Sequence, residues 1–166
     1  SLAVDGGLTI SMAKMDAVVE IDVANLVVRC GPGIMNAELG RRVAEHGLFY
    51  PPDPASYEYC SIGGNIAENS GGLRCVKYGV TRDYVLGLEV VLADGSVIRT
   101  GGKTVKDVMG YDLTGLIVGS EGTLGIVTEA TLRLLPMPPP KTTLLAFFPG
   151  IREADRKSTR LNSSHT

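Results

Sequence analysis

Apolar and β-branched residues recur in short runs along most of the chain, separated by turns rich in glycine, proline, aspartate and asparagine. Runs of this length and composition are typical of strands. Two of them flank Asp94-Gly95, a pair that strongly indicates a two-residue hairpin. The pattern therefore predicts strands over residues 8–12, 17–22, 25–30, 85–93, 96–100, 126–135 and 142–148.

The pattern becomes helical between residues 35 and 46, where Leu39 and Val43 share a face and Glu38 can pair with Arg42 one turn later. Arg41 and Glu45 have the same spacing. Asp112 is placed to cap a short helix over 113–118. Hairpin-linked strands with few helices predict an α+β domain, with a mostly antiparallel sheet flanked by helices.

Length and charge narrow the classes of function. The chain has 166 residues, of which 44% are hydrophobic, so it can build one core. A net charge of −2 gives no reason to expect nucleic acid as a partner, and no apolar run is long enough for a transmembrane segment. Three cysteines without metal-ligand spacing favour reduced thiols in the cytoplasm.

Both ends of the sequence are unlike natural termini. We expect residues 1–150 to be part of one domain, 151–154 to begin the next segment, and 155–166 to be an adapter-derived, non-native tail. The chain is then interpreted as an internal piece of a longer protein.

The run from Cys60 to Gly72 is the most informative candidate for chemistry. It contains two glycine pairs, with serine and asparagine between them and almost no charge. Glycine allows a backbone to approach a ligand closely, and small polar side chains add neutral donors and acceptors. This composition indicates a flat, heteroatom-rich, partly anionic ligand. Taken alone, the same run also fits two glycine turns around a short helix.

Two familiar nucleotide motifs match only in part. Gly31-Pro32-Gly33 lies between a strand and a helix, but Asn36 replaces the third glycine of a dinucleotide fingerprint and Pro32 lacks an N–H. Gly102-Lys103-Thr104 resembles the end of a P-loop, but Val97 stands where its first glycine belongs. We reject both interpretations.

Several longer motifs occur in a fixed order: Pro51-Pro52-Asp53-Pro54, Cys60–Gly72, Lys77-Tyr78-Gly79, residues 100–104, residues 108–113 and Gly119-Ser120-Glu121-Gly122-Thr123-Leu124-Gly125-Ile126-Val127-Thr128. Together they resemble the FAD-binding (PCMH-type) domain of vanillyl-alcohol-oxidase-type flavoproteins, over essentially all of residues 1–150. Within that superfamily the chain is most similar to the flavin-binding chains of glycolate oxidases and to D-lactate and D-2-hydroxyglutarate dehydrogenases.

The resemblance implies FAD as cofactor and a flavin-dependent dehydrogenase or oxidase of 2-hydroxy acids as the parent protein. It implies an electron acceptor or partner subunit (a quinone, cytochrome or iron–sulfur protein) and a cytoplasmic location, with peripheral association at the inner membrane as an option. The residues that it implies for FAD binding are Pro52, Asp53, Ser56, Ser61, Ile62, Gly63, Gly64, Asn65, Asn69, Ser70, Gly71, Gly72, Gly125, Ile126 and Val127.

No catalytic residue or metal ligand is assigned, because the resemblance places the first phosphate loop and the substrate-binding part of the family outside this sequence. The chain alone is therefore expected to be inactive. Lys77, Lys103 and Lys106 are weaker candidates for neutralising phosphate or an acidic substrate. Two alternatives stay open: an oxidase of sugars or alcohols with covalent flavin, for which Cys60 is a candidate link, and a non-enzymatic glycine-rich binding module.

Overall fold

A five-stranded antiparallel sheet organises the chain in the computed structural model, which describes residues 5–103, 110–140, 142, 145, 147–152 and 155. The strands follow the spatial order β1-β2-β6-β4-β5. All four neighbouring pairs are antiparallel, which confirms the predicted α+β class. Their bounds are β1 Val18–Asp22, β2 Val27–Cys30, β4 Val85–Val91, β5 Val97–Gly101 and β6 Ile126–Arg133.

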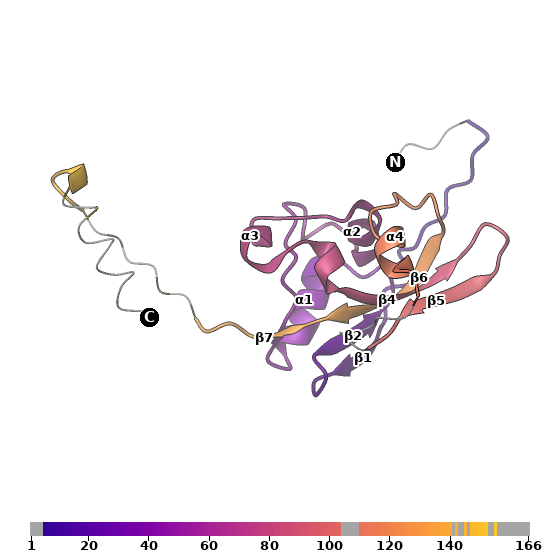
Figure 1. The fold of residues 1–166 in the computed structure, drawn as a ribbon, viewed down its shortest axis with the longest axis horizontal. Coiled ribbons are helices and arrows are strands. Elements are labelled where there is room, and N and C mark those ends of the chain that lie inside the picture. The colour runs from indigo at the N-terminus through magenta and orange to yellow at the C-terminus, as the bar shows by residue number, and fades with distance from the viewer. Residues whose placement is uncertain are drawn as a thin grey trace.

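Short helices lie over the sheet, and a second, two-stranded sheet lies beside it (Figure 1). β3 and β7 pair antiparallel to form the small sheet. The remaining bounds are α1 Asn36–Ala44, β3 Leu48–Phe49, α2 Ile62–Glu68, α3 Cys75–Tyr78, the 3₁₀-helix η1 Thr81–Tyr84, α4 Leu113–Ile117 and β7 Leu135–Pro136.

Local sequence explains where two of these helices form. In α1 the buried Leu39 and Val43 share one face, while Glu38 accepts a 2.7 Å hydrogen bond from Arg42, as predicted. Arg41 also pairs with Glu38, and not with Glu45. The Asp112 carboxylate caps α4 by accepting the Gly115 amide at 2.7 Å. An amide at a helix start lacks an intrahelical acceptor, so this bond stabilises the first turn.

The hairpin between β4 and β5 forms at the predicted place, but its loop is longer than two residues. Gly95 has a φ of +82° and donates to Leu92 O, while Leu92 N donates to Ser96 O. Residues 93–95 are therefore the loop, the three-residue type with glycine at a positive φ. Asp94 favours it further, because its carboxylate accepts the Ser96 amide at 2.9 Å.

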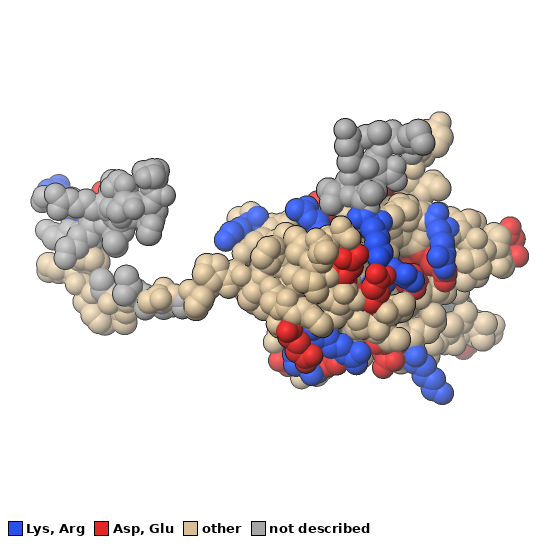
Figure 2. Space-filling view, turned by 90° about the horizontal axis from the view of Figure 1, so that it is seen from below, with Lys and Arg blue, Asp and Glu red and all other residues tan. Residues whose placement is uncertain are grey.

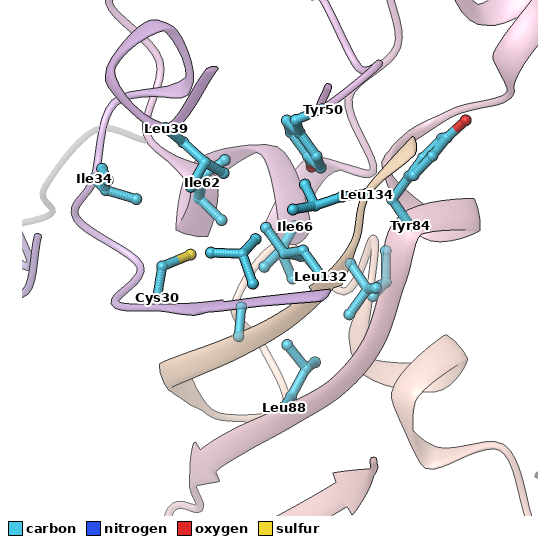
Figure 3. Packing of buried hydrophobic residues seen from close by; sticks show 14 of the residues in the cluster. Cys30, Ile34, Leu39, Tyr50, Ile62, Ile66, Tyr84, Leu88, Leu132 and Leu134 are labelled. Carbon is cyan, nitrogen blue, oxygen red and sulfur yellow. The ribbon is translucent and has the colours of Figure 1, made fainter. Parts of the chain in front are cut away.

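The core lies between the helices and one face of the large sheet (Figure 3). Leu39, Ile62, Ile66 and Leu132 are all fully buried there. The Cys30 thiol packs among them, and burial raises its pKa to about 12. A thiol in this state stays protonated and unreactive at neutral pH.

The opposite face of the sheet is polar, and its charges are paired. Arg29 bonds to Glu129 at 3.0 Å and pairs with Glu20, while Lys103 donates to Glu20 at 2.6 Å. Arg99 donates to Glu89 at 3.0 Å on the adjacent hairpin. Seen from below, acidic and basic side chains lie next to one another and do not separate by sign (Figure 2).

Two predicted strands are wrong. Residues 8–12 are in no strand, and Leu8 and Ile10 are exposed. Gly33 lies against the last residue of this segment, because a Cβ on Gly33 would be 2.2 Å from Met12 O. Gly31 lies against the backbone just after the segment, because a Cβ on Gly31 would be 2.1 Å from Met15 O. Close backbone contact therefore occurs at the end of the segment and just after it, and residues 8–12 belong to no strand ladder.

The described residues of 142–148 are not in a strand either, and Leu145 and Phe147 are exposed. The structure does not describe residues 104–109, which include Lys106, Val108 and Met109, or residues 153–154. Of the predicted tail it describes only Asp155.

Replacing Tyr50 with phenylalanine should leave the free energy of unfolding unchanged or raise it. The Tyr50 hydroxyl is buried and has no hydrogen-bond partner among the described residues, so it is desolvated without compensation. Tyr84 is the matched control: its ring contacts Tyr50 edge-on, but its hydroxyl donates to Tyr78 O at 2.7 Å. Tyr84→Phe should therefore lower stability by about 1 kcal/mol in urea unfolding. Equal losses in both variants would contradict this interpretation.

Candidate functional site

The two glycine-rich segments meet although they are far apart in the sequence. One contains α2, and the other is the turn between α4 and β6. Gly119 N donates to Ile66 O and Glu121 N donates to Ala67 O, both at 2.9 Å. Glu121 takes a left-handed φ of 56° to do so. The turn, which follows α4 in Figure 1, therefore lies directly against α2.

A pocket of about 230 Å³ lies where the two segments meet. It brings together six of the predicted site residues: Ser61, Gly63, Gly64, Gly125, Ile126 and Val127. The other lining residues were not predicted as ligand contacts: Ile10, Met12, Pro32, Ile66, Ala67, Ile117, Ser120 and Gly122. The lining is mostly aliphatic with two serine hydroxyls, which suits a flat ring system carrying heteroatoms.

The start of α2 is stabilised by the protein itself. Ser61 Oγ accepts the Gly64 amide at 3.2 Å, which makes Ser61 the N-cap of the helix. The amides of Ile62, Gly63 and Asn65 donate to Ile34 O, Pro32 O and Ser61 O. These three amides are therefore already bonded within the protein.

Some glycines of the pocket are required by packing within the protein, and others are not. A Cβ on Gly63 would lie 2.7 Å from the Pro32 Cβ, and one on Gly125 would lie 2.6 Å from a Val90 methyl group. Packing within the protein therefore requires these two glycines. A Cβ on Gly64 would meet only Ser61 Oγ, at 3.3 Å, and one on Gly122 would meet nothing within 4 Å. At Gly64 the missing side chain keeps pocket space free, as a close-fitting ligand needs.

The other predicted residues lie outside this pocket lining, and several of them contact one another. The Asp53 carboxylate accepts the Arg74 amide at 2.9 Å, and a Cβ on Gly72 would lie 2.0 Å from Asp53 O. Pro52 O accepts a bond from the buried Asn36 side chain at 3.2 Å. The two contacts of Asp53 join the proline-rich connector to the segment after α2, and the contact of Pro52 joins it to α1. A role of Pro52, Asp53, Ser56 and Gly72 in FAD binding stays a prediction.

Three further predicted residues belong to α2 and the turn after it. Ile62 is fully buried in the core. Asn65 is buried as well, and its Nδ2 has no partner among the described residues. Asn69 ends the helix in a left-handed conformation, and Ser70 N donates to Asn65 O. Like Ser70 and Gly71, they do not line the pocket, and their contact with a ligand also stays a prediction.

Lys77 and Lys103, the two weaker candidates that the structure describes, have other partners. Lys103 bonds to Glu20 and Asp22 on the polar face of the sheet, and the Lys77 ammonium lies 4.9 Å from the centre of the Tyr78 ring. Cys60 is half-buried and is not among the pocket residues. No group of three potential metal-ligating side chains occurs in the described part of the chain.

A family model described as "FAD binding domain" matches residues 1–101. The chain belongs to the FAD binding domain family. This match covers α2 and the first glycine-rich segment, and it confirms FAD as the cofactor type indicated by the sequence. The second segment, with Gly125–Val127, follows the matched region and completes the pocket.

Curated relatives extend the similarity beyond the matched region. The chain is 59% identical over 150 residues to glycolate oxidase subunit GlcD of Bacillus subtilis, covering 90% of this chain and 32% of that protein. It is 47% identical over 148 residues to D-lactate dehydrogenase of Archaeoglobus fulgidus, covering 89% and 33%. The chain thus spans about a third of the length of these relatives.

Solved structures carry the same fold. Two structures of alkyldihydroxyacetonephosphate synthase match with TM-scores of 0.65 and 0.67 at 30% and 28% identity. The matches cover 75% and 92% of this chain, and 22% and 27% of the solved chains. Among the described residues of this FAD binding domain, no helix has the length and apolar character needed to cross a bilayer.

Proposed function

We propose that this chain is the FAD-binding part of a flavin-dependent dehydrogenase or oxidase that acts on the CH–OH group of a 2-hydroxy acid of the glycolate or D-lactate type. The relatives support the reaction class, since their names are those of a D-lactate dehydrogenase, a D-2-hydroxyglutarate dehydrogenase and a component of glycolate oxidase. Because the chain spans a third of their length, the substrate-binding part of the enzyme is assigned to sequence outside it.

The observation that carries the proposal is the shared pocket. Two glycine-rich segments about 60 positions apart form one cavity, lined by Gly64 from the first and Gly125 from the second. Its volume of about 230 Å³ is below the range of roughly 300–1,000 Å³ that is usual for drug-sized ligands. A dinucleotide needs more room, so the pocket accommodates one portion of FAD, and the rest of the protein encloses the remainder.

The residues of the pocket position a ring system and exclude water from it. Ile66, Ile117 and Ile126 supply apolar surface, and Ser61 and Ser120 are the polar residues beside it. When bound, the flavin supplies a ring nitrogen that accepts hydride from the substrate α-carbon. The base that removes the hydroxyl proton is assigned to the part of the protein outside this chain.

The partners follow from the same reaction class. The substrate is a small 2-hydroxy acid, and the electrons pass on to a quinone, a cytochrome or an iron–sulfur partner protein. Relatives named as one subunit of glycolate oxidase support a multisubunit enzyme. We place the protein in the cytoplasm or peripherally at the inner membrane.

A flavin titration tests the proposal directly. The 166-residue chain should quench FAD fluorescence with a saturable but weak dependence on protein concentration, because its pocket encloses only part of the cofactor. Acid denaturation should release the flavin, since Cys60 is not among the pocket residues, and the chain should not oxidise glycolate or D-lactate. No saturable binding would refute the proposal, and flavin retained after acid treatment would favour the covalent oxidases.

A further inference from the structure

The FAD pocket depends on the relative position of two walls that come from separate segments. Ile66 and Ala67 on α2 form part of one wall, and Ile117 and Ser120 beside the α4–β6 turn form part of the other. Each wall residue is held by its own segment, so the spacing between the segments decides whether the pocket fits a ligand. Two backbone bonds, from Gly119 and Glu121 to α2, cross this junction directly.

Two side chains, those of Asn69 and Arg82, also connect α2 to the α4–β6 turn, and Asn69 contacts Arg82. Asn69 ends α2 with φ 52° and ψ 50°, a conformation that asparagine tolerates better than most residues with side chains. Its Oδ1 accepts the Arg82 amide at 2.9 Å. The 3₁₀-helix η1 is tied to the same segment by Thr81, whose amide and hydroxyl both donate to Ser70 O.

Arg82 completes this connection by bonding to the end of α4. Its guanidinium donates to Val118 O at 2.7 Å, and the Val118 side chain is buried at the end of α4. Gly119 follows directly and lies between the two residues: a Cβ placed on it would be 3.3 Å from Asn69 Cβ and 3.6 Å from an Arg82 nitrogen. A hydrogen bond from a charged donor to a carbonyl is stronger than one between neutral groups.

We propose that Asn69 and Arg82 are positioning residues that set FAD affinity by holding the α4–β6 turn against α2. We name this pair the clamp. Neither residue lines the pocket, so both act through the segments they join. The effect of the clamp on FAD affinity rests on the proposed function. Its effect on the position of the α4–β6 turn does not.

Matched substitutions separate the hydrogen bonds from the backbone conformation. Asn69→Gly keeps the left-handed turn but removes the acceptor, while Asn69→Asp keeps both. Arg82→Met removes the guanidinium, while Arg82→Lys keeps a cationic donor. Arg99→Met is the control, because Arg99 pairs with Glu89 on the polar face of the sheet.

Amide hydrogen exchange on the 166-residue chain is the first readout, because it needs no ligand. In Asn69→Gly and Arg82→Met the Gly119 and Glu121 amides should exchange about tenfold faster, while the Val90 amide in the sheet keeps its protection. The second readout is FAD titration, in which both variants should bind about tenfold more weakly. Asn69→Asp and Arg82→Lys should recover most of each loss.

Each outcome decides the inference. Unchanged exchange at Gly119 and Glu121 would refute the clamp, and faster exchange with unaltered FAD affinity would refute its role in binding. Equal losses of affinity in Asn69→Asp and Asn69→Gly would instead mark the Asn69 amide group as a direct ligand contact. If the unsubstituted 166-residue chain binds no FAD, both the proposed function and the role of the clamp in affinity are refuted. Amide hydrogen exchange would still decide whether the clamp holds the turn against α2.

Discussion

Gly64→Ala should weaken FAD binding about tenfold or more without lowering the stability of the fold. The added Cβ would meet no protein atom within 4 Å except Ser61 Oγ, which also lines the pocket, so the methyl group occupies space that the ligand needs. Within a helix, alanine is favoured over glycine by about 1 kcal/mol, which offsets the tight contact with the serine. FAD titration and urea unfolding of the same sample measure the two effects.

Gly63→Ala is the matched control in the neighbouring position. Its Cβ would lie 2.7 Å from Pro32 Cβ and 3.0 Å from Pro32 O, so the strain falls on the protein. Crowding of this kind costs about 1–3 kcal/mol, and unfolding should begin at a lower urea concentration. If Gly64→Ala lost as much stability as Gly63→Ala, its Cβ would strain the protein and not only fill ligand space. If it bound FAD as tightly as the unsubstituted chain, the pocket would not be the ligand site.

Leu132→Ala should lower the free energy of unfolding by about 2–5 kcal/mol. Leu132 is fully buried in β6, the strand between β2 and β4 at the centre of the sheet, and it packs in the core cluster (Figure 3). The substitution removes apolar contacts and leaves a cavity that the strand ladders on both sides prevent from closing. Urea unfolding followed by circular dichroism, without flavin, gives the value.

Leu73→Ala serves as the comparison for this loss. Leu73 is 94% exposed, so the same change in side chain should alter stability by less than about 0.5 kcal/mol. Similar losses at both positions would show that the measured effect comes from the chemistry of the substitution and not from burial in the core.

Elements fixed by local chemistry could be predicted from the sequence. The Asp112 cap, the amphipathic α1 and the hairpin around Gly95 each depend on residues within a few positions, and all three form. The loop of that hairpin was predicted one residue too short, because the pattern does not distinguish a tight turn from one followed by a glycine at positive φ.

Elements fixed by distant contacts could not be predicted. Residues 8–12 have the composition of a strand, but Met12 lies against Gly33, and Ile10 and Met12 contribute to the pocket. The prediction did bring together Gly64 and Gly125, because each belongs to a long motif of the family. It did not find Ile117 or Ile66, since an apolar residue that lines a pocket has the same pattern as one in the core.

The strand order leaves β1 and β5 as the outermost strands of the sheet, each with one side unpaired by any other described strand. Edge strands of this kind can pair with strands of neighbouring molecules unless charged side chains prevent the pairing. Here Glu20 and Asp22 on β1 and Arg99 on β5 are placed to act as gatekeepers, while the exposed Val19 and Val97 favour self-association. Preparations of this chain will therefore stay monodisperse more readily in dilute, low-salt buffer than in concentrated salt, where screening weakens that protection.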